Sequence, residues 1–326
     1  MIRTLLFFPL LAFMSQTVAA PVTEGQPLKD PASETWIPGN LDGCVLRDSR
    51  AYENPAEGIS YKFSRESSTG VATLFIYDGG RDTLPDDTSG TYSKRIVDGA
   101  ISTLRMVEEK GIYKNVNHTE TKIISWKQDG GAEAFRAFAS ATYSKLEGEE
   151  KKEVPVRSLI AATIFNKQIF KLRYTERVDL DGNNLDTNDL DARAKGILNA
   201  FDQIFNEQRL LESAKGSINT FLAAPASTEG QAAGRKLFEF ASAASLPAIE
   251  IDISILSNLG KSDEESEEEE SVSLLLLQTY IAGNVAEQIT SESWKDSPEP
   301  GFAVAKSAYK ALRKKDSSIR RRPTLE

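Results

Sequence analysis

The chain has 326 residues, a net charge of −9, one cysteine and one histidine. This length suggests two domains, with cores large enough to fold without disulfides. An acidic chain repels phosphate backbones, so we do not expect nucleic acid as a partner. The single Cys44 has no partner for an internal disulfide, and we expect it to be a small buried apolar residue.

With one histidine and one cysteine, the chain lacks the side chains that many classes of enzyme use for catalysis. A zinc site built from His and Cys lacks ligands, and a catalytic triad would have to use His118. We interpret His118 as a surface or loop histidine. Ser307 and Lys310 have the spacing of penicillin-recognising enzymes, but the partner motifs are absent. We therefore predict no catalytic residue and no cofactor. A carboxylate pair for hydrolysis stays open, because such pairs have no fixed spacing.

Residues 1–20 have the pattern of a cleaved signal peptide. Arg3 is followed by the apolar run Leu5–Met14 and then by the small residues Val18–Ala20. The run has ten residues, whereas a membrane-spanning helix needs about twenty. We predict cleavage near Ala20 and an exported protein, periplasmic or extracellular, without a transmembrane segment. Residues 21–35, rich in Pro and small polar side chains, are predicted to form a flexible leader.

Strand patterns dominate residues 36–206. Cys44–Tyr52 and Gly58–Arg65 are short extended runs, and the β-branched, aromatic run Val71–Tyr77 is typical of a strand buried on both faces. An amphipathic helix is predicted from Tyr92 to Lys110, because its apolar residues recur at three- and four-residue steps.

The remaining elements of this region are four strands and a helix. Asn166-Lys167 is predicted to be a two-residue hairpin loop. An apolar stripe with helical spacing runs from Leu190 to Phe205. We predict an α+β domain, an antiparallel sheet flanked by helices, with these four strands: Thr121–Lys127, Ala132–Ser144, Val154–Phe165 and Gln168–Arg177.

A polar stretch before the closing helix raises the question of calcium. Asp179, Asp181 and Asn183 match the first three ligand positions of an EF-hand loop, but Asn184 and Leu190 stand where glycine and glutamate are required. We interpret the stretch mainly as the capped entry to the helix. Asp179, Asp181 and Asn183 remain candidate metal ligands, with a calcium-dependent surface module as the corresponding alternative function.

Residues 207–326 are predicted to form a small helical domain. Residues 248–260 fit a strand or a helix equally well. Ser297–Gly301 is predicted to be the turn between the last two helices. The predicted helices are Glu207–Ala223, Ala232–Ser245, Ser273–Ile289 and Phe302–Lys315.

Charge is segregated within this second domain. Seven acids occupy Asp263–Glu270, within a predicted acidic loop at 261–270, and a basic tail covers 313–326. We interpret them as a solvated loop and a frayed tail. The alternative is that Arg320, Arg321 and Arg322 rest on an anionic surface such as membrane headgroups.

The order of elements from Cys44 to Phe205 resembles the PsbP-like fold. The resemblance rests on the leading strand pair, the strand Gly70–Asp78, the helix Ile96–Val107, the antiparallel meander and the closing helix Ile197–Phe201. This group includes an extrinsic protein of photosystem II, a nuclear-import factor that binds a small GTPase, and secreted bacterial relatives. The resemblance covers about half the chain and carries no functional residue with it. It implies a sheet flanked by helices that is used for binding rather than catalysis.

These observations favour an exported, non-enzymatic binding or accessory protein whose partner is a protein or another envelope component. The alternative from a different class is a carboxylate-based hydrolase with a cleft between the two domains. Acids gathered in one pocket would favour the hydrolase. An apolar or aromatic patch at the sheet edge would favour the binding protein.

Overall fold

The computed structural model describes residues 22–66, 68–81, 83–84, 87–127, 133–147, 152–178, 187–251, 255, 259 and 267–326. The chain divides into two compact units, Met1–Phe205 and Asn206–Glu326. This division lies one residue from the boundary predicted between 206 and 207. In the described part of the chain, no helix is long and apolar enough to cross a membrane.

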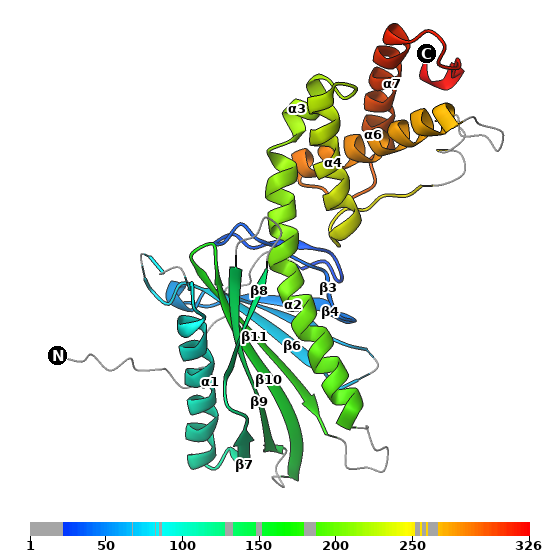
Figure 1. The fold of residues 1–326 in the computed structure, drawn as a ribbon. Helices are drawn as coiled ribbons and strands as arrows, with labels where there is room; N and C mark the ends of the chain where they lie inside the picture. The colour runs from blue at the N-terminus through cyan, green and yellow to red at the C-terminus, as the bar shows by residue number, and fades with distance from the viewer. Residues whose placement is uncertain are drawn as a thin grey trace. The chain divides into compact units, whose positions relative to one another are not determined.

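The first unit contains a large antiparallel sheet, so the predicted α+β class is confirmed (Figure 1). Its strand order is β3-β4-β5-β6-β11-β10-β9-β7, and β8 also pairs with β9. A separate two-stranded sheet joins β1 to β2. The strands are β1 (Leu28–Lys29), β2 (Trp36–Ile37), β3 (Asn40–Leu41), β4 (Cys44–Ala51), β5 (Ile59–Ser64), β6 (Val71–Tyr77), β7 (Tyr113–His118), β8 (Lys122–Lys127), β9 (Glu133–Glu147), β10 (Lys152–Phe165) and β11 (Gln168–Arg177).

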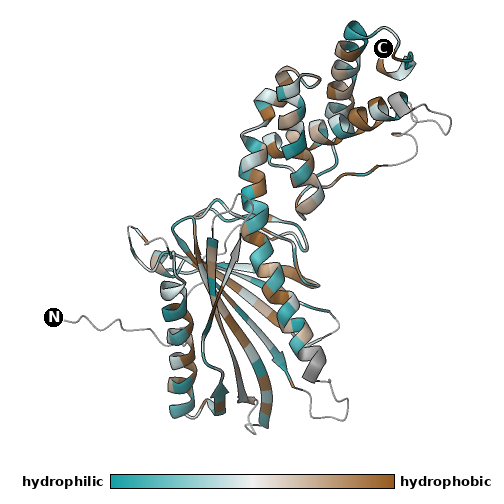
Figure 2. Cartoon of the chain, in the orientation of Figure 1, coloured by the Kyte–Doolittle hydropathy of each residue, from teal (hydrophilic) through white to brown (hydrophobic). Residues whose placement is uncertain are grey.

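Two helices cover different parts of this sheet on opposite faces. Helix α1 (Thr91–Glu109) packs on β9 and β10 through buried residues that include Val97 and Ile160. Helix α2 (Thr187–Lys215) packs on β4, β5, β6 and β11, against residues such as Phe63 and Leu172. In Figure 2, α1 carries hydrophilic residues on the side away from the sheet, the amphipathic pattern that the sequence predicts.

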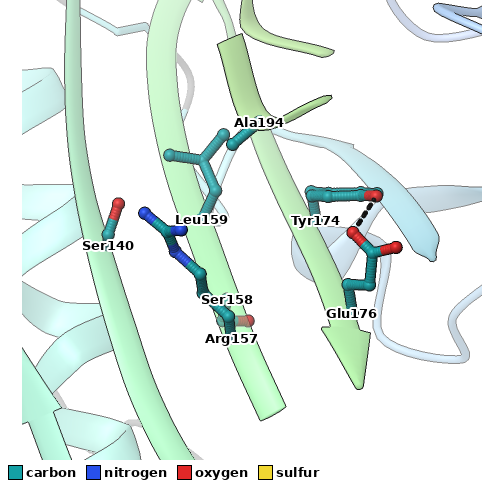
Figure 3. A pocket seen from close by; sticks show the side chains of 7 residues that line it. All are labelled: Ser140, Arg157, Ser158, Leu159, Tyr174, Glu176 and Ala194. Atoms are coloured by element: carbon teal, nitrogen blue, oxygen red, sulfur yellow. Dashed lines mark hydrogen bonds between the residues drawn. The ribbon is translucent and has the colours of Figure 1, made fainter. Parts of the chain in front are cut away.

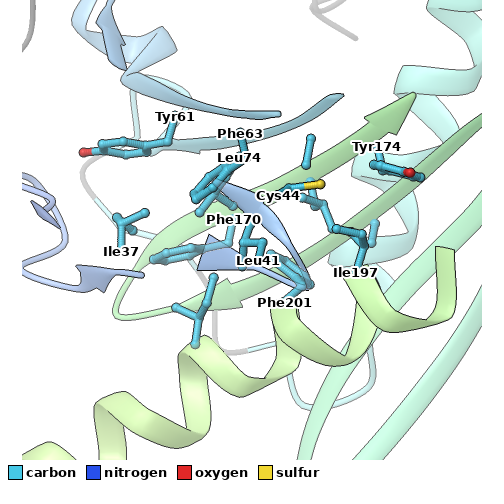
Figure 4. Packing of buried hydrophobic residues seen from close by; sticks show 14 of the residues in the cluster. Ile37, Leu41, Cys44, Tyr61, Phe63, Leu74, Phe170, Tyr174, Ile197 and Phe201 are labelled. Carbon is cyan, nitrogen blue, oxygen red and sulfur yellow. The ribbon is translucent and has the colours of Figure 1, made fainter. Parts of the chain in front are cut away.

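Aromatic rings fill the core beneath α2 (Figure 4). Phe205 lies at 5.1 Å from both Phe170 and Phe201, measured between ring centroids, with the ring planes nearly perpendicular. This edge-to-face geometry adds to the stabilisation that burial itself supplies. Cys44 belongs to the same cluster and is 0% exposed, as predicted. Burial raises the pKa of its thiol, which keeps it protonated and unreactive.

The β10–β11 hairpin has the two-residue loop that the sequence predicts. Phe165 pairs with Gln168, and the two residues between them, Asn166 and Lys167, have φ of 46° and 59°. Positive φ at both positions gives the turn twist that matches the strands. The loop therefore fixes which β11 residues face α2.

The predicted flexible leader, residues 21–35, is corrected by the structure. From Val22 onward the described segment packs on the sheet, and Leu28–Lys29 pairs with β2. Asp30 is 0% exposed and accepts hydrogen bonds from the Tyr61 hydroxyl at 2.6 Å and the Ser33 amide at 2.8 Å. A buried carboxylate with these donors anchors a segment whose composition alone suggested disorder.

Two strand predictions also need correction. Val71–Tyr77 is buried on one face only, because Ala72, Leu74 and Ile76 are buried whereas the alternate residues are half-buried. Tyr113–His118 forms the strand β7, which the sequence pattern did not predict. β7 pairs with β9 through an irregular register and is mostly exposed, so it lacks the apolar alternation that marks a strand.

The second unit is helical. Helices begin earlier than predicted where a cap or a proline allows it: the Ser227 hydroxyl accepts from the Gly230 amide at 3.0 Å, and Pro298 starts a helix inside the predicted turn Ser297–Gly301. Besides the end of α2, the described helices are α3 (Ile218–Ala223), α4 (Thr228–Ala243), α6 (Glu267–Ser291), α7 (Pro298–Lys315) and the 3₁₀ turn η2 (Pro323–Leu325).

The two charged segments of this unit are partly helical. Glu267–Glu270, predicted to lie in the acidic loop 261–270, form the first turn of α6, and Arg313–Lys315 form the last turn of α7. Acids at a helix N-terminus and bases at a C-terminus complement the helix dipole. Residues 261–266, and most of the ambiguous segment 248–260, lie outside the described residues.

Candidate functional site

The face of β6 and β11 that is turned away from α2 combines cations with aromatic rings. We call its residues Phe75, Tyr77, Lys171 and Arg173 the cation–aromatic face. Lys171 stands directly opposite Phe75 in the strand pairing, and the four residues alternate with buried core residues of the same strands. All four are half-buried, because α1 packs on β9 and β10 rather than on β6 and β11.

Lys171 is held over two aromatic rings. Its Nζ lies 4.6 Å from the centroid of Phe75 and 5.4 Å from that of Tyr77. Burial, and then the charge of Arg173, lower the pKa of Lys171 to about 8. The amine is therefore still mostly protonated at pH 7, a desolvated cation whose charge the ring faces favour.

Arg173 is positioned by neutral hydroxyl groups. Its Nη2 donates to the Tyr143 hydroxyl at 2.6 Å and its Nε to the Ser158 hydroxyl at 3.4 Å. Tyr143 in turn stacks on Tyr113, with ring centroids 4.5 Å apart. Burial acts to lower the pKa of Arg173, but Tyr143 and Tyr113 outweigh it and raise the pKa. The guanidinium is thus oriented without being neutralised.

Among the described residues, no carboxylate forms an ion pair with Lys171 or Arg173. The opposite face differs, since Arg136 pairs there with Asp202 and Arg193 with Glu176. A partly desolvated charge without a counter-ion is costly unless a bound group supplies the opposite charge. The cation–aromatic face is therefore suited chemically to an anion joined to a flat apolar group.

A small cavity lies on the other face, between β10, β11 and α2 (Figure 3). Its volume of about 10 Å³ leaves room for one water molecule at most. Glu176, which is 2% exposed, accepts from the Tyr174 hydroxyl at 2.8 Å and pairs with Arg193. Burial and Glu176 raise the pKa of Tyr174. Among the described residues that line this cavity, Glu176 is the one acid, so they do not supply a carboxylate pair.

The sequence-predicted metal candidates Asp179, Asp181 and Asn183 lie outside the described residues. Within the residues that are described, no group of three or more His, Cys, Asp or Glu side chains is placed to hold a metal ion. His118 is exposed on β7; its Nε2 lies 2.7 Å from Arg105 Nη2 and its Nδ1 3.0 Å from the Thr119 carbonyl oxygen. It is a surface histidine, as predicted.

The prediction that three arginines of the basic tail could contact an anionic surface is wrong for Arg322. Arg322 is 4% exposed and donates to the Leu259 carbonyl and, at 2.9 Å, to the Ser273 hydroxyl, so it is not available to an anionic surface. Arg320 and Arg321 are exposed, and Arg321 Nε lies 3.8 Å from the Glu326 carboxylate. The tail is therefore anchored rather than frayed.

Sequence reasoning missed Lys171 and Arg173. The signal was present: Lys171, Arg173 and Thr175 alternate with Phe170, Leu172 and Tyr174, the pattern of a strand with one polar face. What the pattern lacked was the pairing of β11 with β6, a strand about ninety residues earlier in the sequence, which brings the cations onto the aromatic rings. No protein-family model matches the chain, and no curated protein matches it.

Proposed function

We propose that this chain is an exported, non-enzymatic binding protein that holds an anionic envelope component on the cation–aromatic face. The observation that carries the proposal is the pair of half-buried cations, Lys171 and Arg173, without a carboxylate partner among the described residues. Charge-assisted hydrogen bonds to a carboxylate, sulfonate or phosphate would satisfy both cations. The rings of Phe75 and Tyr77 would support an apolar or aromatic part of the same ligand.

The proposal is tested with 2-naphthoate, an aromatic carboxylate, and its neutral amide. We expect naphthoate to shift the backbone amide signals of β6 and β11 in a titration followed by NMR, and 2-naphthamide to bind at least tenfold more weakly. Lys171→Met and Arg173→Met should each weaken naphthoate binding by about tenfold, since one charge-assisted hydrogen bond contributes about 1.5–3 kcal/mol.

Lys62→Met is the matched control. Lys62 is exposed on β5, and its strand partner Thr73 also pairs with Arg173, so the control removes one charge from the same sheet face without touching an aromatic ring. Its affinity should stay within twofold of the parent. Equal losses of naphthoate affinity in all three variants would show that only the net charge matters. Equal binding of 2-naphthoate and 2-naphthamide would contradict the proposal.

Export and the PsbP-like fold remain proposals that need their own tests. Mass spectrometry of the protein recovered from its native envelope should give an N-terminus at Pro21. A pull-down from the same envelope extract, with the Lys171→Met/Arg173→Met double variant alongside, would identify the natural anion. A component retained equally by both proteins binds elsewhere.

A further inference from the structure

Strand β8 lies at an edge of the sheet. It pairs with residues 133–138 of β9, while β7 pairs with residues 141–145 on the same side of β9. β10 occupies the other side of β9. Among the described strands nothing pairs with the outer edge of β8, which leaves alternate backbone N–H and C=O groups open to a further strand.

Two adjacent side chains of β8 are both apolar and exposed. Ile123 is 41% exposed and Ile124 is 39% exposed. Ile123 pairs with Ala137, which belongs to the α1-side core, and Ile124 with Arg136, which points to α2, so the two isoleucines lie on opposite faces. An exposed edge strand with apolar side chains on both faces is a template for pairing with a further strand.

Charge decides which kind of strand would fit. β8 begins at Lys122 and ends at Lys127. If two copies of the chain paired antiparallel in full overlap, Lys122 of each copy would stand opposite Lys127 of the other, and like charges directly opposite destabilise a strand pair. Lysines at a sheet edge oppose self-association for this reason. A strand with acidic residues at both ends would instead gain two favourable pairs.

We infer that β8 is a docking edge for an extended segment of another protein, apolar at its centre and acidic at both ends. The segment adds to the sheet as a further strand, with main-chain hydrogen bonds supplying affinity and its side chains covering Ile123 on one face and Ile124 on the other. This inference is independent of the cation–aromatic face, which lies on β6 and β11.

The probe is the capped peptide Glu-Val-Thr-Val-Val-Glu, compared with Lys-Val-Thr-Val-Val-Lys. Binding is measured by amide hydrogen exchange of the full chain, resolved by residue. We expect the acidic peptide to slow exchange of the β8 amides that do not bond to β9, with little change on β4 or β7, and the basic peptide to have no effect. Raising the salt concentration should weaken binding of the acidic peptide, because salt screens exposed charges.

Ile124→Lys should lower the affinity for the acidic peptide by about tenfold, because it removes an apolar contact worth about 1.5 kcal/mol. The new lysine has the same charge as the lysines of β8. Met106→Lys is the matched control, because Met106 is 41% exposed on α1 and lies outside the strand edge. Circular dichroism checks that both variants fold. The inference would be overturned if the acidic peptide gave no protection of β8, if the basic peptide protected β8 equally, or if Ile124→Lys abolished a dimer of the chain. The result of the naphthoate titration does not bear on this inference.

Discussion

The two faces of strands β6 and β11 differ in burial and in the type of residue that they carry. On the α2 side, Phe170, Leu172 and Leu74 are 0% exposed within one aromatic and aliphatic core. On the other side, Lys171, Arg173 and Phe75 are half-buried, and the cations have neutral neighbours. One face holds the unit together, and the other keeps two partly desolvated cations, of which Lys171 has a pKa lowered to about 8 by burial and by the charge of Arg173.

This difference follows from where the helices pack. Helix α2 packs on β4, β5, β6 and β11, whereas α1 packs on β7, β9 and β10. The α1 side of β6 and β11 is therefore left outside both hydrophobic clusters. Residues on that side are free to serve binding, because they contribute little to the core. The contrast predicts that substitutions on the two faces separate stability from ligand affinity.

The largest expected effect lies in the α2-side core. Phe170→Ala removes a ring that contacts Phe165 and Phe205, at centroid distances of 6.0 and 5.1 Å. We expect the free energy of unfolding to fall by about 3–5 kcal/mol, measured by urea denaturation. A loss below 1 kcal/mol would mean that this face is not the structural one.

The next effect concerns the ion pair on the same side. Arg136→Met leaves the half-buried Asp202 without its cation, and we expect a loss of about 3 kcal/mol at pH 7. At pH 5 the loss should be smaller, because a protonated Asp202 needs no counter-ion. Thermal denaturation at the two pH values provides the measurement, and an equal loss at both would show that Arg136 acts through packing alone.

Asp202 should also impose a pH dependence of its own. Burial raises its pKa to about 6, despite the nearby Arg136. Since the folded state holds the proton more tightly than the unfolded state, Asp202 favours folding below about pH 4, and this contribution is lost as the pH rises to about 6. The decrease is on the order of 2 kcal/mol. In Asp202→Asn this part of the stability curve should be flat; an unchanged slope would assign it to another carboxylate.

Lys171 should show the opposite slope at higher pH. Its pKa is lowered to about 8, so its charge destabilises the folded state below pH 8, and this cost disappears as the pH rises towards the unfolded pKa of about 10.4. Lys171→Met should therefore be more stable than the parent by about 1 kcal/mol at pH 7, measured by urea denaturation. A marked loss of stability would place Lys171 in the structural core.

The smallest effect is on ligand affinity. Naphthoate binding should weaken a few-fold between pH 7 and 9 as Lys171 loses its proton near pH 8. Lys171→Arg keeps its charge over this range and should bind with constant affinity, as followed by the same NMR titration. A parent protein with pH-independent binding would remove Lys171 from the site.

The sequence predicted what depends on local pattern. The α1 stripe, the Asn166-Lys167 loop and the antiparallel meander follow from periodicity and turn chemistry, and the structure confirms them. The order of the segment around Asp30 depends on a hydrogen bond to Tyr61, thirty-one residues away, and could not be predicted from composition. The cation–aromatic face likewise needed the β6–β11 pairing, because its cations lie on β11 and its rings lie on β6.

The burial of Arg322 has a consequence for the helical unit. Its guanidinium joins the fifth residue from the C-terminus to Leu259 and Ser273, and the Tyr309 hydroxyl accepts from its amide at 2.7 Å. Replacing Arg322 by Ala would remove both guanidinium contacts together. Arg322 therefore acts as a latch that ties the last turn of the helical unit to Leu259 and Ser273.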